Sequence, residues 1–288
     1  MGIIFSEIPK LFKMIKAAVI GDPISHSLSP KIHGYFLQKY KINGSYEAIR
    51  VEKQNLATDV LKLIEQGYAG FNVTIPHKEE IFKMCYFRSK SAELTGAVNT
   101  VFITEDKKLF GHNSDVDGFL NNLKISAPEF NLENKTAFVI GAGGAARAIV
   151  YGLIKSKVKK IFITNRSFDR AQKLITDFSK LAEIEFLDLE NFSKKLGECD
   201  LLVNSTALGM TGQEALHINL ENLNKSALVY DIVYKPLITD LLASAKNRGN
   251  KIITGIGMLT QQALIGFEMW FKIKPEADAT LEKILTEK

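Results

Sequence analysis

The sequence predicts two α/β domains, the second built on a doubly wound parallel sheet. Its 288 residues are enough for two modest hydrophobic cores. Short apolar runs alternate with helical patterns along most of the chain, which is typical of parallel sheets with helical connections. Near the middle, the glycine-rich turn Gly141–Gly144 follows an apolar run at once and opens an alanine-rich helical pattern.

Composition and charge argue against several classes of function. The formal charge of +5 is mild and the lysines are scattered, so we expect no nucleic-acid partner. No apolar run approaches the length of a membrane span. Cys85 and Cys199 lie far apart, which fits two reduced thiols in a cytoplasmic protein. No histidines form a ligand pair, so we predict no metal site.

The first domain is predicted to begin after an N-terminal extension, residues 1–13, and to fill residues 14–115. The apolar runs predict strands at 17–20, 46–51, 70–74, 97–102 and 108–111. Helices are predicted at 31–40 and 54–65, after residue 78 and from residue 118. Ser29 is the expected N-cap of the first helix, with Pro30 as its first helical residue.

The alternation continues over residues 116–254, the predicted second domain. Strands are expected at 136–140, 160–164, 184–187, 200–203, 227–232 and 251–254. Helices are expected at 145–154, 167–178 and 238–247. A long apolar helix at 258–271 and an amphipathic helix at 276–286 end the chain.

The glycine turn fits a dinucleotide-binding site of the Rossmann type. Gly141 can make the tight turn, and Gly143 lets a pyrophosphate approach the backbone. Ala146 permits close helix–strand packing, and the free N–H groups at the helix start attract phosphate. The alternative is an ordinary glycine-rich turn between a strand and a helix.

The end of the second strand of this unit indicates which dinucleotide is used. An NAD site has Asp or Glu there, whereas this strand runs into Asn165 and Arg166. The Arg166 guanidinium suits a 2′-phosphate, so the sequence favours NADP. A surface arginine at the start of a helix is the alternative.

Several polar residues stand where chemistry is possible. Lys78 lies in the opening turn of a helix, where the dipole disfavours a cation, and this suits an acid/base role or simply a solvated surface side chain. Asp115 precedes a helix and is either functional or part of an N-cap. Ser27 and Ser29 can bind a carboxylate at a helix start, although Ser29 as a plain cap fits equally well. Gln262 is uninformative alone.

Eight ordered segments resemble the shikimate dehydrogenase family. They are GDPISHSLSP at 21–30, NVTIPHK at 72–78, GAVNT at 96–100, NSD at 113–115, GAGGAAR at 141–147, NRS at 165–167, NST at 204–206 and GMLTQQA at 257–263. Each segment alone is weak, but the ordered set covers the chain from about Met14 onward and is specific. Val116 and Asp117 lengthen the spacing before Gly118 relative to many members of the family. Asp117 is therefore a second candidate for the catalytic aspartate, with Asp115 preferred.

The resemblance implies reversible, NADP-dependent reduction of 3-dehydroshikimate to shikimate. Lys78 and Asp115 would be the acid/base pair. The substrate would be held by Ser27, Ser29, Thr74, Asn99, Asp115 and Gln262. NADP would be held by Gly141, Ala142, Gly143, Gly144, Ala145, Asn165, Arg166, Arg170, Thr206, Ile232 and Gly255.

The resemblance also implies a discontinuous first domain, because the C-terminal helices in residues 255–288 would return to it. The expected partner is the small-molecule substrate, and a monomer and a homodimer are both compatible with the sequence. Two other functions remain open: a quinate/shikimate dehydrogenase that uses NAD, and a catalytically silent NADP-binding homologue.

Overall fold

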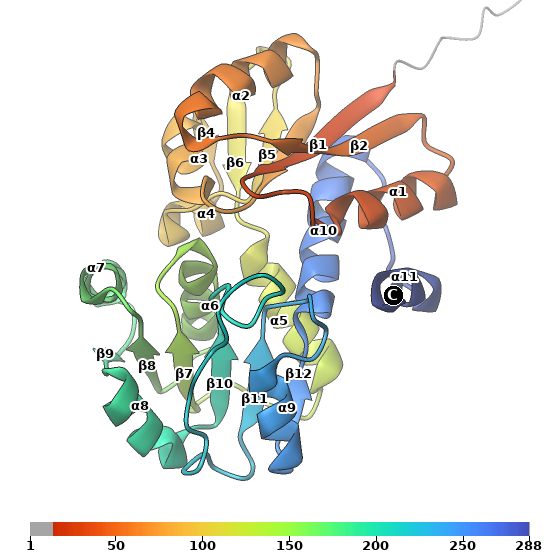
Figure 1. Cartoon of the computed structure of the whole chain (residues 1–288). Helices are drawn as coiled ribbons and strands as arrows, with labels where there is room; N and C mark the ends of the chain where they lie inside the picture. The colour runs from red at the N-terminus through yellow and green to blue at the C-terminus, as the bar shows by residue number, and fades with distance from the viewer. Residues whose placement is uncertain (1–13, 288) are drawn as a thin grey trace, which may run out of the picture.

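The computed structural model describes residues 14–287, which form two six-stranded sheets (Figure 1). The first sheet has the strand order β2-β1-β3-β5-β6-β4. Its strands are β1 (Ile15–Gly21), β2 (Gly44–Arg50), β3 (Gly70–Val73), β4 (Phe87–Arg88), β5 (Thr100–Ile103) and β6 (Leu109–His112). β1 pairs in parallel with β2 and β3, whereas β5 is antiparallel to β3 and β6, so this sheet is mixed.

The helices of this half follow the apolar pattern of the sequence. They are α1 (Ser29–Lys39), α2 (Leu56–Glu65) after the 3-10 turn η1 (Lys53–Asn55), α3 (Lys78–Met84) and α4 (Lys90–Thr95). The expected N-cap at Ser29 is wrong. Leu28 already has right-handed helical angles, so Ser29 is the first residue of α1, and its N–H donates to Ser27 Oγ at 3.3 Å.

The second sheet is entirely parallel, with the order β12-β11-β10-β7-β8-β9. Its strands are β7 (Thr136–Ile140), β8 (Lys160–Thr164), β9 (Ile184–Phe186), β10 (Leu201–Asn204), β11 (Leu228–Asp231) and β12 (Lys251–Ile253). The helices of this half are α6 (Gly144–Lys155), α7 (Phe168–Phe178), α8 (Leu189–Lys195), which runs into the 3-10 turn η2 (Leu196–Glu198), and α9 (Asp240–Asn247). The predicted Rossmann-like arrangement is confirmed.

Two helices pack against each other between the sheets, α5 (Asp115–Ser126) and α10 (Gly255–Phe271) (Figure 1). Gly118 permits their close approach, since a Cβ atom there would lie 2.9 Å from Gln262 Cβ. α10 continues to the first sheet, where Trp270 donates its indole N–H to Val101 O at 2.9 Å. The last helix, α11 (Ala279–Thr286), packs on α1. The predicted return of the C-terminal helices to the first sheet is confirmed.

Across residues 14–287, no helix is both long and apolar enough to span a membrane. The same residues contain no group of three or more His, Cys, Asp or Glu side chains that could hold a metal ion.

Candidate active site

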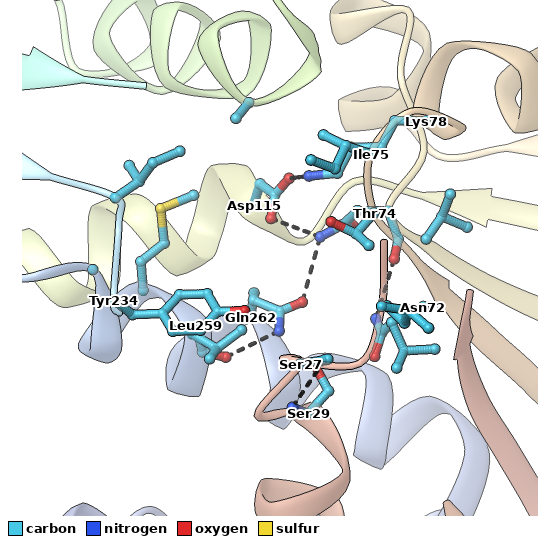
Figure 2. Close-up of a pocket in the computed structure, with 18 of the residues that line it drawn as sticks. Ser27, Ser29, Asn72, Thr74, Ile75, Lys78, Asp115, Tyr234, Leu259 and Gln262 are labelled. Atoms are coloured by element: carbon cyan, nitrogen blue, oxygen red, sulfur yellow. Dashed lines mark hydrogen bonds and ion pairs between the residues drawn. The ribbon is translucent and has the colours of Figure 1, made fainter. Parts of the chain in front are cut away.

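A pocket of about 220 Å³ lies where the loops of the two sheets meet (Figure 2). From the first sheet it is lined by residues that follow β1 and β3, among them Ser27 and Thr74. From the second sheet come the start of α6 and the loop after β11, and α10 closes one wall. The carboxyl ends of strands from both sheets therefore face the same space, where α/β folds commonly bind ligands.

Lys78 and Asp115 form an ion pair in this pocket. The first residue of α3 brings Lys78 Nζ to 2.5 Å from Asp115 Oδ2, and the two side chains are only 15% and 8% exposed. Asp115 is the first residue of α5, and its other carboxylate oxygen accepts a hydrogen bond from Asn99 Nδ2 at 2.8 Å. Its carboxylate is thus turned into the pocket, and Lys78 is not a solvated surface lysine.

A network of amides and hydroxyls fixes Asn99 beside this ion pair. Asn99 Oδ1 accepts the Ser114 backbone N–H at 2.8 Å, so Nδ2 is left to donate to Asp115. Gln262 Oε1 lies 3.4 Å from Asn99 Nδ2, and Gln262 Nε2 donates to Leu259 O at 2.9 Å. Each amide is therefore held in one orientation, and these residues present fixed donors and acceptors to a ligand.

Ser27 and Ser29 line the pocket away from the ion pair (Figure 2). They stand at the start of α1, where the positive end of the helix dipole favours an anion. Thr74 approaches from β3, and Gly21 makes room for it, because a Cβ atom there would lie 2.4 Å from Thr74 Cγ2. The pocket thus has hydroxyl groups at the start of α1 on one side and the Lys78–Asp115 ion pair on the other.

The glycine-rich turn after β7 is packed on one side and open on the other. Gly141 has φ of +118°, and a Cβ atom there would lie 2.5 Å from Ser205 Oγ. At Gly143 a Cβ atom would meet nothing within 4 Å, so a phosphate has room to approach the backbone. These features fit a dinucleotide. Gly144 lies against Lys78, while Ala145, Ile232 and Gly255 line the pocket itself.

The other expected cofactor residues lie along the same sheet edge, outside the pocket lining. Asn165 follows β8 and donates its side-chain amide to Ser167 O at 2.8 Å. Arg166 and Arg170 are exposed beside it. Thr206 follows β10 and donates its hydroxyl to Asn204 Oδ1 at 2.7 Å. The expected cofactor residues thus form two groups: those of the glycine turn and the pocket wall, and an outer strip in which Asn165 and Thr206 are half-buried and Arg166 and Arg170 are exposed.

Sequence reasoning missed several lining residues, above all Tyr234. Its ring points into the pocket from the loop after β11 (Figure 2), and burial raises the pKa of its phenol. Met210 and Asn72 were also missed. The available signal was position, since Tyr234 and Met210 both follow parallel strands at their carboxyl ends, as binding residues do in such folds.

Known proteins resemble this chain over almost its full length. Residues 19–101 match the shikimate dehydrogenase substrate binding domain, and residues 124–239 match the shikimate / quinate 5-dehydrogenase family. A shikimate dehydrogenase (NADP(+)) from Paramagnetospirillum magneticum is 43% identical over 265 residues, which cover 92% of this chain and 95% of that protein.

Solved structures agree with these sequence matches. Shikimate dehydrogenase from Aquifex aeolicus has a TM-score of 0.87 at 31% identity, covering 96% of this chain and 99% of that one. The Thermus thermophilus enzyme, solved in complex with NADP(H) and shikimate, has a TM-score of 0.83 at 34% identity, covering 94% and 98%. The chain therefore belongs to the shikimate dehydrogenase family.

Proposed function

We propose that Lys78 and Asp115 carry the proton transfer of this NADP-dependent shikimate dehydrogenase. The observation behind the proposal is their ion pair, 2.5 Å long and buried in a pocket that both sheets line. The reaction reduces the ketone of 3-dehydroshikimate to the alcohol of shikimate, and it is reversible. NADPH, when bound, supplies the hydride.

During reduction the substrate carbonyl oxygen gains negative charge and needs a proton. The Lys78 ammonium can stabilise that charge and donate the proton, so that the ketone becomes an alcohol. In the reverse direction neutral Lys78 accepts the hydroxyl proton. The Asp115 carboxylate accepts a hydrogen bond from Lys78 and another from Asn99. The Lys78 amine is therefore held in place during both reduction and oxidation.

The remaining polar residues of the pocket suit a hydroxylated ring that carries one carboxylate. Ser27 and Ser29 would bind the carboxylate through their hydroxyl groups at the start of α1. Thr74, Asn99 and Gln262 would bind ring hydroxyls. All three line the pocket, and Asn99 is hydrogen-bonded to both Asp115 and Gln262. This arrangement would hold the carbonyl carbon near Lys78.

The glycine turn and the strip beside it would hold NADP. The N–H groups at the start of α6 suit the pyrophosphate, and Arg166, helped by Arg170, suits the 2′-phosphate. In domain terms, residues 14–115 with 255–288 would bind substrate and residues 116–254 would bind cofactor. We expect a cytoplasmic enzyme that acts as a monomer or a homodimer.

One assay tests the proposed specificity. The rate of shikimate oxidation is measured with NADP and with NAD, and the same pair is repeated with quinate. We expect the highest kcat/KM for shikimate with NADP. A preference for NAD would favour a quinate/shikimate dehydrogenase that uses NAD. No turnover of either substrate with either cofactor would favour a catalytically silent homologue.

A further inference from the structure

Arg147 joins the two halves of the molecule beside the active site. It lies in the first turn of α6, just after the glycine turn, and its side chain is only 11% exposed. Arg147 Nε donates to the backbone O of Thr95, the last residue of α4. Arg147 Nη2 pairs with Asp177 on α7 at 2.6 Å. One guanidinium thus connects α4 of the first half with α7 of the second. Figure 1 shows α4 directly above α6, the helix that carries Arg147.

The position of Arg147 is unfavourable for α6 taken alone. A cation in the first turn of a helix opposes the positive end of the helix dipole. The cost is offset outside α6, by the Asp177 carboxylate and by a carbonyl at the negative end of α4. The residue therefore makes physical sense as a contact between the two halves rather than as a helix-stabilising residue.

The backbone that Arg147 holds leads directly to the catalytic pair. Gly96, with φ of +61°, lies under the guanidinium, since a Cβ atom there would be 3.3 Å from Arg147 Nη2. Two residues on, the Val98 N–H donates to Lys78 O at 2.9 Å. The next residue, Asn99, donates a hydrogen bond from its side-chain amide to Asp115 Oδ1. A shift of the segment 95–99 would move both members of the ion pair.

The glycine turn meets Lys78 at the same place. A Cβ atom at Gly144 would lie 3.3 Å from Lys78 Cδ and 3.4 Å from Lys78 Cβ. The turn proposed to hold the cofactor is therefore in contact with the stem of the lysine proposed to move the proton. Arg147, three residues beyond Gly144, makes its hydrogen bond to Thr95 at the same junction.

We propose that Arg147 is a positioning residue, which fixes the glycine turn of the cofactor half against Lys78 and Asp115 of the substrate half. Arg147 touches neither substrate nor cofactor in this role. Because reacting groups must meet within a narrow range of distances, its loss should slow the chemical step more than it weakens the binding of either ligand. The inference rests on the role proposed above for Lys78.

The test compares Arg147→Met with Lys155→Met, a control on the same helix. Lys155 also pairs with α5, at 3.4 Å from Asp117, but its side chain is 55% exposed and far along α6 from the glycine turn. For Arg147→Met we expect kcat to fall roughly 10- to 100-fold, the scale of a displacement of about 1 Å, with the Kd of NADP and the Kd of shikimate changed less than about threefold. Lys155→Met should change none of these values.

A second readout needs neither ligand. Amide hydrogen exchange across residues 95–99 of the free protein should be faster in Arg147→Met and unchanged in Lys155→Met, because the Val98 N–H bond to Lys78 O would open more often. Arg147→Lys, which can keep one of the two contacts, should restore part of kcat and part of the protection. If Arg147→Met fails to fold, Arg147→Lys alone provides the test of kcat and of amide exchange.

Two results would overturn the positioning role. Unchanged kcat and exchange in both Arg147 variants would show that the contact does not position the site. A loss of NADP affinity equal to the loss of kcat/KM would make Arg147 a cofactor-binding residue instead. Lys78→Ala in the same assays separates this from the proposed function: if it keeps normal kcat, the role of Lys78 fails whatever Arg147 does.

Discussion

The substrate side of the site and the cofactor side are built in opposite ways. On the substrate side, Asp115, Asn99 and Gln262 are buried, and Asn99 is hydrogen-bonded to both of the others. On the cofactor side, Gly143 faces open space and Arg166 is exposed. A buried network is rigid and sensitive to loss of any member, whereas an exposed cation acts through charge that salt can screen. The two sides should therefore respond differently to substitution, salt and pH.

The largest effect is expected from removal of the buried cation. Lys78→Ala should lower kcat by roughly two to four orders of magnitude, the scale of a lost acid/base group. The KM for shikimate should change much less. Steady-state kinetics measure both values. Lys83→Ala is the control, since Lys83 lies on the same helix in an exposed ion pair with Glu80 and should keep its kcat. A near-normal kcat in Lys78→Ala would make the assignment wrong.

The serine hydroxyls of the substrate side should affect binding more than turnover. Ser27→Ala removes a hydroxyl expected to bond the substrate carboxylate, a loss of about 1.5–3 kcal/mol, or roughly ten- to more than a hundredfold in the KM for shikimate. Calorimetric titration with NADP checks the other side, where affinity should not change. Weaker NADP binding would remove Ser27 from the substrate site.

The cofactor side should show a smaller effect that depends on salt. Arg166→Ala should weaken NADP binding by about tenfold and leave NAD almost unaffected, since only NADP carries the 2′-phosphate. The loss should shrink as ionic strength rises, because Arg166 is exposed. The kcat/KM for both cofactors at low and high salt measures this. Equal losses for NADP and NAD would show that Arg166 does not contact the 2′-phosphate.

The last prediction concerns the free energy of unfolding below neutral pH rather than activity. His33 of α1 is fully buried, stacked on Tyr46 at 3.9 Å between ring centroids, and burial lowers its pKa to about 3. Since the unfolded chain binds a proton near pH 6.5 and the folded chain does not, the free energy of unfolding should fall as pH drops from 6.5 toward 3. At pH 5 the loss from this one group is about 2 kcal/mol.

Urea unfolding of the wild type and of His33→Phe between pH 7 and pH 5 isolates that contribution. Between pH 7 and pH 5 the free energy of unfolding of the variant should fall by about 2 kcal/mol less than that of the wild type, because the variant lacks the one proton that unfolded His33 binds. His112 will leave a residual slope in both proteins, because burial also lowers its pKa. Identical slopes in the two proteins would show that His33 is not responsible.

The sequence predicted most of the fold because the second sheet follows local patterns. Short apolar strands and intervening helices appear in it much as expected. The short elements β4, α4 and α8 were missed, because two to seven residues are too few to show a hydrophobic period. Serine is a favoured N-cap residue and Pro30 follows Ser29, so the sequence predicts a cap there. Only the backbone angles of Leu28 show that the helix has already begun.

Only part of the site was predicted, because the rest depends on how distant helices and loops pack together. Motif residues such as Lys78 and Asp115 were identified, but their ion pair depends on α3 and α5 meeting, which no local pattern specifies. Tyr234 reaches the pocket from a loop, and Arg147 resembles any helical arginine until its partners on α4 and α7 are known. Local patterns do not supply contacts between elements far apart in sequence. The return of the C-terminal helices and the pairing of Lys78 with Asp115 were expected only from the family resemblance.

A double-mutant cycle on Lys78 and Asp115 tests the central claim most directly, which is that the two residues work as one buried unit. We measure kcat for Lys78→Ala, for Asp115→Ala and for the double variant. Residues that act together show strongly non-additive losses, so the double variant should lose about as much as the worse single variant. Losses that simply multiply, or a single variant that keeps near-normal kcat, would contradict the account.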